Sequence, residues 1–237
     1  FGKFGSKYSI LFSPDLVLQV TVTGQLTLLM LIERLELAGV SVVSGNTDGI
    51  VLKLLPEQED LADEIVADWE FDTDYEMEMT EYSGLYSRDV NNYIAIKPDG
   101  SIKGKGAYAD QSEHYYKLRK NPVNSICVEA VKIFLRDKIP IENIIRDCKD
   151  ITKFITVRTV NGGAIHDGVL LGKSIRWYYS STDLDAIYYS TNGNKVPRSD
   201  GAEPIMDLPS KFPSDVDYNW YIEEALDILN KIGCKKK

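Results

Sequence analysis

The sequence has few of the residues that most often bind structural zinc. Its three cysteines, Cys127, Cys148 and Cys234, lie far apart without a C-x-x-C pair, and the 237 residues include only two histidines. A zinc site is therefore not predicted, and widely spaced thiols fit a reducing compartment. We expect a cytoplasmic protein, or a phage-encoded one that works in the cytoplasm of its host.

Long apolar runs are also missing. The longest unbroken run, from Leu28 to Ile32, is far shorter than the roughly 20 residues that cross a bilayer. The N-terminus has no basic region followed by an apolar signal segment. Neither a solenoid period nor a low-complexity window appears, so the composition predicts a soluble globular protein without a membrane partner.

Basic residues are absent from one part of the chain. Residues 56–81 hold twelve acidic side chains and no Lys or Arg, whereas the formal charge of the whole chain is −9. The remainder therefore carries a small positive excess, part of it between Arg88 and Lys120. A mildly basic surface for nucleic acid and an ordinary surface of interspersed charges are both compatible with this pattern.

Helix and strand signals alternate along the chain. The phrase Ser13-Pro14-Asp15 predicts a helix start, and the helix should run to about Ala38, where Gly39 ends it. A β-hairpin over 40–55 and an acidic amphipathic helix over 56–69 are expected next. The first helix should pack a broad apolar face against a sheet, and this face consists of Leu28, Leu31, Ile32, Leu35 and Leu37.

The rest of the chain continues this mixture of elements. We expect strands over 75–87, 93–96 and 151–160, helices over 123–138 and 218–232, and a short helix after Pro140. The fold class is therefore α+β, with an antiparallel sheet and packed helices followed by a smaller mixed α/β region. The dipeptide Asn121-Pro122, which is typical of turns and loops, predicts a domain boundary near residue 120.

The tip of the predicted hairpin holds the sequence Asn46-Thr47-Asp48-Gly49. Asn, Asp and Gly tolerate the backbone conformations that tight turns need, so a turn alone explains them. A carboxylate on such a turn is also suited to a hard cation such as Mg²⁺. These four residues taken alone are compatible with both interpretations.

Four phrases, in the right order, resemble the polymerase core of family B DNA polymerases. Residues 1–5, Phe-Gly-Lys-Phe-Gly, resemble the end of a motif Asn-Ser-x-Tyr-Gly, and residues 45–49 resemble Tyr-Gly-Asp-Thr-Asp-Ser. The stretch 75–93 is similar to a Leu-Glu-x-Glu strand that leads to a Lys-Lys-Arg-Tyr primer grip. Residues 216–223 are similar to the thumb phrase Ile-Asp-x-x-Tyr-Tyr-Ile-Glu.

The resemblance implies the C-terminal half of a polymerase palm over 1–120 and a thumb over 121–237. It implies nucleotidyl transfer from dNTPs to a primer 3′-hydroxyl, with primer–template DNA as partner and two Mg²⁺ as cofactors of the complete polymerase. The upstream fingers and palm of the same polypeptide would complete the enzyme. We expect the chain alone to be inactive, because its opening phrase begins inside a motif.

In this resemblance Asp48 is the catalytic aspartate and a metal ligand. Asn46 stands where the family has another aspartate; with Thr47 it would orient ligands or water without adding charge. Phe1 and Gly2 correspond to residues beside the nascent base pair.

A second group corresponds to the primer grip and to a Lys-Gly phrase beside the duplex. These predicted DNA-binding residues are Arg88, Asn91, Asn92, Tyr93, Lys103 and Lys105. Asn91 and Asn92 replace cations by amides, which can read minor-groove acceptors but should weaken the salt dependence of binding. The Lys-Gly-Lys-Gly phrase at 103–106 places two cations on an unencumbered backbone, which suits phosphate contact.

Two other functions are compatible with the sequence. A palm-like module that binds DNA without catalysis is favoured by Asn46, Gly49, Asn91 and Asn92, each of which removes a charge or polar group that catalysis uses. A structural protein unrelated to nucleic acid fits the acidic total. An Asp-x-x-Ser-x-Tyr-Pro phrase upstream would favour the enzyme.

Overall fold

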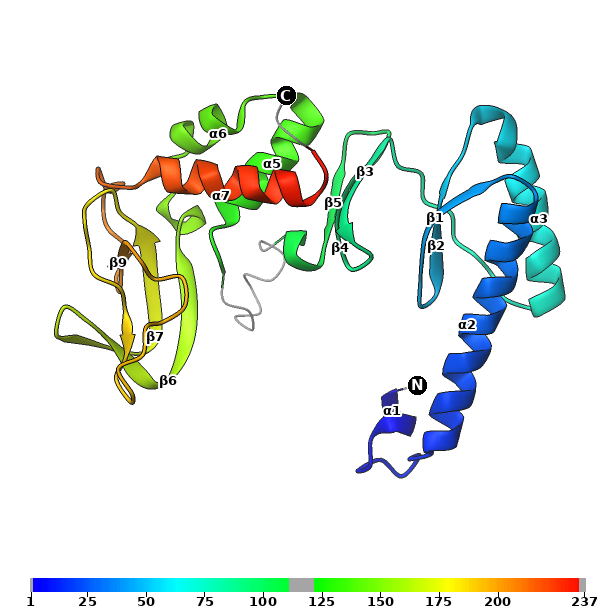
Figure 1. Ribbon diagram of the computed structural model, residues 1–237, viewed down its shortest axis with the longest axis horizontal. Helices are drawn as coiled ribbons and strands as arrows, with labels where there is room; N and C mark the ends of the chain where they lie inside the picture. The colour runs from blue at the N-terminus through cyan, green and yellow to red at the C-terminus, as the bar shows by residue number, and fades with distance from the viewer. Residues whose placement is uncertain (1, 111–121, 235–237) are drawn as a thin grey trace. The chain divides into compact units, whose positions relative to one another are not determined.

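The computed structural model describes residues 2–110 and 122–234, and its fold is mixed α+β, as predicted. The chain divides into two compact units, Phe1–Thr80 and Glu81–Lys237, each with its own hydrophobic core (Figure 1). The boundary predicted near residue 120 falls outside the described residues. The functional division into 1–120 and 121–237 therefore stays a prediction.

In the first unit a long helix packs against an acidic helix and a β-hairpin (Figure 1). The elements are α1 (Gly2–Gly5), α2 (Pro14–Leu37), β1 (Ser41–Asn46), β2 (Gly49–Lys53), the 3₁₀ turn η1 (Pro56–Gln58) and α3 (Glu59–Thr73). Helix α2 starts as predicted, because the Ser13 hydroxyl accepts the N–H of Leu16. It ends before Gly39, whose φ of 83° closes the last turn.

The hydrophobic core of the first unit is small and lies between α2, α3 and the β1–β2 hairpin. Its buried members are Leu31, Leu35, Val40, Ala62 and Trp69. The Trp69 indole N–H also donates to the Thr27 carbonyl at 2.9 Å, which ties α3 to α2. Helix α3 is therefore fixed both by apolar burial and by a partly buried hydrogen bond.

Much of α2 is apolar and exposed. Leu37 is 83% exposed, contrary to our prediction, because it follows the buried Leu35 by two residues and so points about 200° away around the helix. Among the described residues α2 alone is long and apolar enough to cross a membrane, and 6% of its most apolar window is buried. A helix of a soluble protein can pass the same test, so the cytoplasmic location stays a prediction.

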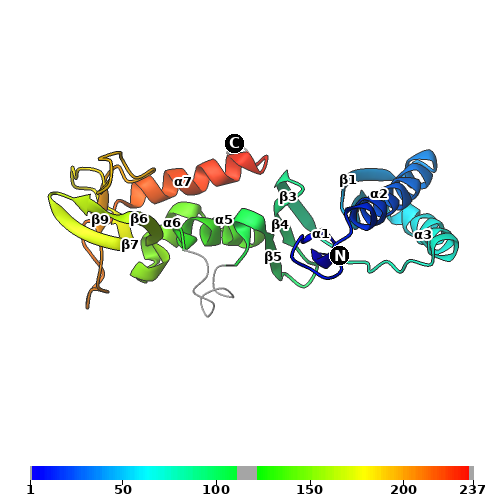
Figure 2. The same cartoon turned by 90° about the horizontal axis from the view of Figure 1, so that it is seen from below.

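The second unit has two antiparallel sheets, with helices between and after them. Its elements are β3 (Gly84–Asp89), β4 (Asn92–Ile96), β5 (Ile102–Lys105), η2 (Gly106–Tyr108), α5 (Ser125–Asp137), α6 (Ile141–Asp147), η3 (Ile151–Lys153), β6 (Thr156–His166), β7 (Val169–Tyr179), β8 (Tyr188–Tyr189), β9 (Ala202–Pro204) and α7 (Tyr218–Lys231). The strand orders are β3-β4-β5 and β8-β6-β7-β9. Helix α7 lies alongside α5 (Figures 1 and 2).

Two strand predictions are wrong in part. The strand expected over 75–87 begins only with β3, and the residues before it form neither helix nor strand. The strand expected over 151–160 begins only with β6, because the Asp150 carboxylate accepts the N–H of Thr152 and starts η3. The single antiparallel sheet that we expected is also wrong. Among the described residues, β1–β2 and β3–β4–β5 form two separate sheets.

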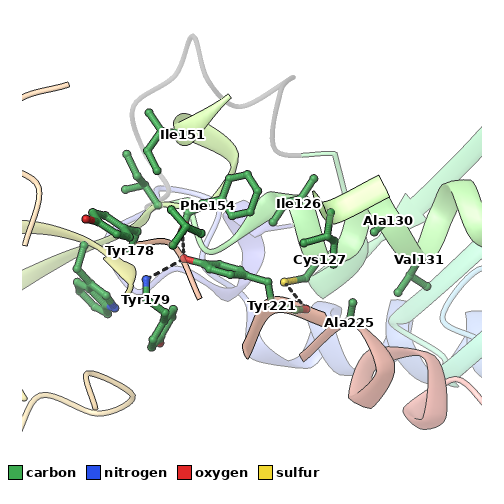
Figure 3. Packing of buried hydrophobic residues seen from close by; sticks show 14 of the residues in the cluster. Ile126, Cys127, Ala130, Val131, Ile151, Phe154, Tyr178, Tyr179, Tyr221 and Ala225 are labelled. Atoms are coloured by element: carbon green, nitrogen blue, oxygen red, sulfur yellow. Dashed lines mark hydrogen bonds between the residues drawn. The ribbon is translucent and has the colours of Figure 1, made fainter. Parts of the chain in front are cut away.

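Tyr221 lies inside the core of the second unit (Figure 3). Its ring is fully buried and meets the ring of Phe154 edge-on, with 4.9 Å between the ring centres. Its hydroxyl donates to the Phe154 carbonyl at 2.8 Å and accepts the N–H of Tyr179 at 2.9 Å. One side chain of α7 thus satisfies backbone groups from two other segments of the core.

Cys127 of α5 faces the same helix. Its thiol donates to the Tyr221 carbonyl at 3.6 Å, and burial raises the pKa of this thiol well above its ordinary value (Figure 3). The thiol is therefore protonated at neutral pH and serves as a small core side chain.

We predict that Tyr221→Phe lowers the free energy of unfolding of the second unit by about 2 to 3 kcal/mol, because a buried carbonyl and a buried N–H lose their partner. Tyr188→Phe is the matched control, since it removes the same atom from a surface contact with Asp185 and should change stability by about 0.5 kcal/mol or less. Urea titration followed by near-UV circular dichroism measures both. Equal losses in the two variants would contradict the prediction.

Candidate functional site

The hairpin β1–β2 places Asp48 at its tip. Asn46 pairs with Gly49 across the hairpin, so Thr47 and Asp48 form the turn. Thr47 has a left-handed φ of 50°, and the Asp48 N–H donates to the Asn46 carbonyl at 2.6 Å. The expected turn is therefore confirmed, and the Asp48 side chain is exposed.

Contacts with α2 hold this hairpin in place. The Glu36 carboxylate accepts the N–H of Val42 at 2.7 Å, just where β1 begins. A Cβ at Gly45 would lie 3.1 Å from Cδ1 of Ile32, so glycine allows β1 to approach the helix closely. The position of the tip within the first unit is thus set by packing on the helix as well as by the turn.

Asp48 supplies one carboxylate. Within residues 2–110 and 122–234 no three His, Cys, Asp or Glu side chains gather as metal ligands would. Beside Asp48, the Thr47 hydroxyl donates to the amide oxygen of Asn46 at 3.1 Å. Mg²⁺ takes one or two carboxylates together with waters and substrate phosphates, so this donor set fits one ligand of a shared site and does not form a site by itself.

The residues predicted beside the nascent base pair are not tested by the structure. Phe1 lies outside the described residues. Gly2 begins α1, and nothing lies within 4 Å of the position its Cβ would take. The predicted place of Phe1 and Gly2 beside the nascent base pair therefore stays a prediction.

The sheet β3–β4–β5 brings the second group of predicted residues together. Tyr93 pairs with Lys105 across β4 and β5, and the Lys105 ammonium lies 5.7 Å from the centre of the Tyr93 ring. Lys103 pairs with Ala95, the next position on the same face, and both lysines are exposed. Ile94 belongs to the opposite face and is buried in the core. This side of the sheet thus carries a half-buried aromatic ring and two exposed cations, while Ala95 on the same side is buried.

Asp89 organises the turn between β3 and β4, and it was not among the predicted residues. Its carboxylate accepts Nδ2 of Asn92 at 2.7 Å, Nε of Arg88 at 2.9 Å and the backbone N–H of Asn91 at 3.0 Å. The hydrogen bond from Asn92 is the largest of the causes that lower the pKa of Asp89 to about 2. The Asp-x-Asn-Asn phrase was the available signal, because an Asp side chain often bonds the backbone two residues on.

The other end of the Asn92 carboxamide is also engaged within the chain. Its Oδ1 accepts the N–H of Ala107 at 2.8 Å, which ties the β3–β4 turn to η2. A Cβ at Gly106 would lie 2.4 Å from this oxygen, and one at Gly104 would lie 1.8 Å from the Tyr108 carbonyl oxygen. These glycines therefore let the chain pack on itself, whereas we had expected them to leave the backbone open for phosphate.

Comparisons with known proteins point toward DNA polymerases. No protein-family model matches the chain. DNA polymerase 1 of Saccharolobus solfataricus is 24% identical over 235 residues, in an alignment that takes in 87% of this chain and 25% of that protein. The chain thus spans about a quarter of the length of this relative. The similarity indicates a distant relation to a DNA polymerase.

We predict that Asn92→Ala raises the pKa of Asp89 from about 2 toward the ordinary value of 3.8, because the strongest hydrogen bond to the carboxylate is lost. A ¹³C NMR titration of the Asp89 carboxyl measures this change. Val90→Ala, in the same turn, removes none of the donors and should leave the pKa at about 2.

The depressed pKa also gives the sign of the pH dependence. Ionised Asp89 favours the folded state above the pKa of the unfolded chain, and this contribution is lost as the pH falls through about 2. A pKa in Asn92→Ala that matches the wild-type pKa would refute the assigned cause.

Proposed function

We propose that the chain is part of a family B DNA polymerase and contributes the C-terminal half of the palm and the thumb. The observation that carries the proposal is Asp48, exposed at the tip of a hairpin that a long helix holds in place. The similarity to a DNA polymerase over 87% of the chain supports it. The proposed reaction transfers a nucleotidyl group from a dNTP to the 3′-hydroxyl of a primer.

In this proposal Asp48 donates one carboxylate to a site for two Mg²⁺, which other parts of the polypeptide complete. Bound Mg²⁺ would activate the primer hydroxyl and neutralise charge on the departing pyrophosphate. The part played by this chain is to hold the carboxylate in a fixed position. Asn46 and Thr47, which bond each other, directly precede Asp48 in the turn and would orient ligands or water there without adding charge.

The face that carries Tyr93, Lys103 and Lys105 is the proposed contact with primer–template DNA. Ammonium groups neutralise backbone phosphates, and an aromatic ring offers a stacking surface to a sugar or base. Arg88 adds less charge here, because its guanidinium is paired with Asp89 at 2.9 Å. The two lysines should therefore account for most of the salt dependence of binding.

A palm-like module that binds DNA without catalysis is the second candidate. It is favoured by the absence, within the described ranges, of an acidic or histidine cluster around Asp48. Both candidates use the same DNA-binding face of the β3–β4–β5 sheet. Mg²⁺-dependent primer extension separates them.

We predict that Asp48→Asn, made in the full-length polypeptide that contains this chain, lowers Mg²⁺-dependent primer extension by about 100-fold or more, because a metal ligand loses its charge. Asp63→Asn is the matched control, since it makes the same change at an exposed position of α3 and should leave extension intact. Primer–template affinity is measured in parallel. Equal extension in wild type and Asp48→Asn would exclude the proposed site, and tight DNA binding without extension in either would favour the second candidate.

We predict that Lys103→Ala and Lys105→Ala each weaken primer–template binding and each lower the slope of log affinity against log salt by about 1. Fluorescence anisotropy over a series of salt concentrations gives both quantities. Lys195→Ala is the control, because its ammonium is already paired with Asp200 at 2.7 Å. If all three variants behave alike, the sheet face is not the DNA contact.

A further inference from the structure

A shallow, open groove lies between the end of α2 and α3, in the most acidic part of the chain. Its volume is about 580 Å³. One wall is the end of α2, with Arg34, Leu37 and Ala38, and the other is a stretch of α3, with Leu61, Glu64, Ile65 and Asp68. On α3, Leu61 and Ile65 lie four residues apart, as do Glu64 and Asp68, so the four positions form a continuous stripe along that helix.

The groove exposes apolar side chains. Leu37 is 83% and Leu61 is 39% exposed, while Ile65 packs in part against the core of the first unit. Leu61 and Ile65 lie one turn apart on α3, and Leu37 lines the other wall. A second apolar surface that fills the groove would remove these side chains from water.

The rim of the groove is acidic, and the first unit does not neutralise it. Arg34, the base among the lining residues, is already paired with Asp72 at 2.7 Å. Glu64 and Asp68 make no ion pair with any residue that the structure describes. Since 56–81 contains twelve acidic and no basic residues, this surface repels nucleic acid and attracts a basic partner.

We infer that this groove binds a basic amphipathic helix of a partner protein. Leu37, Leu61 and Ile65 receive aliphatic side chains that recur at helical spacing. Glu64 and Asp68 pair with Lys or Arg residues that flank those side chains. The stripe on α3 spans about 10 Å, which matches two turns of a bound helix. The inference does not rest on polymerase activity, since the proposed DNA contact is a different surface.

The test uses the whole chain and a labelled helical peptide with Leu at i, i+3, i+4 and i+7 and Lys on both sides. We expect saturable binding that weakens with salt. Leu61→Ser should weaken it about tenfold through lost apolar contact. The double variant Glu64→Gln/Asp68→Asn should weaken it by a similar factor and flatten its salt dependence. Far-UV circular dichroism checks that each variant keeps its fold.

Two controls distinguish binding in the groove from non-specific attraction of a basic peptide to an acidic surface. Glu57→Gln/Asp63→Asn removes the same charge at exposed positions that do not line the groove, and it should change affinity by less than threefold. A peptide with Ser in place of each Leu keeps the charge and should bind at least tenfold more weakly. Equal effects of the two double variants, or equal binding of the two peptides, would overturn the inference.

The occupant of the groove is also tested. Sedimentation that detects dimers of the wild type but monomers of Leu61→Ser would overturn the inference and assign the groove to a second copy. Absence of peptide binding by the correctly folded chain would overturn it as well. Loss of primer extension in Asp48→Asn bears only on the polymerase proposal, so the two failures are distinguishable.

Discussion

The contact between α2 and the β1–β2 hairpin is the constraint on which the candidate site depends. A two-stranded hairpin is marginally stable by itself in water, so Asp48 would have no fixed position without the helix. Gly45 makes the contact close, Glu36 anchors the start of β1, and the N–H of Val40 donates to the Leu35 carbonyl at the corner between helix and strand. Apolar burial, the close approach allowed by Gly45 and two hydrogen bonds thus together hold this small hairpin against the helix.

The sequence was most informative where structure is decided locally. A hydroxyl before Pro14, a glycine at the end of the helix and a turn around Asp48 act over a few residues, so their outcome could be predicted. The same signals could not reveal Asn92 bonding Ala107, because that contact joins residues 15 positions apart. The alternation over 75–87 was also insufficient, since a strand needs a hydrogen-bonding neighbour as well as a period of two.

In the candidate site, too, the local features could be predicted from the sequence and the contacts between distant residues could not. The location of Asp48 at a turn followed from residue types. The shared face of Tyr93 and Lys105 was not predicted, because it depends on the register between β4 and β5, which joins residues twelve positions apart. The role of Asp89 was not predicted, because the resemblance concerns cations and an aromatic ring, whereas the structure uses an acid to order the turn beside them. Net charge was the least informative quantity, because the acids concentrate in the first unit and the exposed lysine face belongs to the second.

The buried position of Cys127 allows the opening of the hydrophobic core of the second unit to be followed by the rate of thiol alkylation. Alkylating reagents attack the thiolate, and burial against α7 both raises the pKa of this thiol and shields it. A reagent therefore reaches it only while α5 and α7 are transiently apart, whereas Cys148 and Cys234 are partly exposed in the closed state. The rate of the slow phase of alkylation therefore reports how often this core opens, without any added probe.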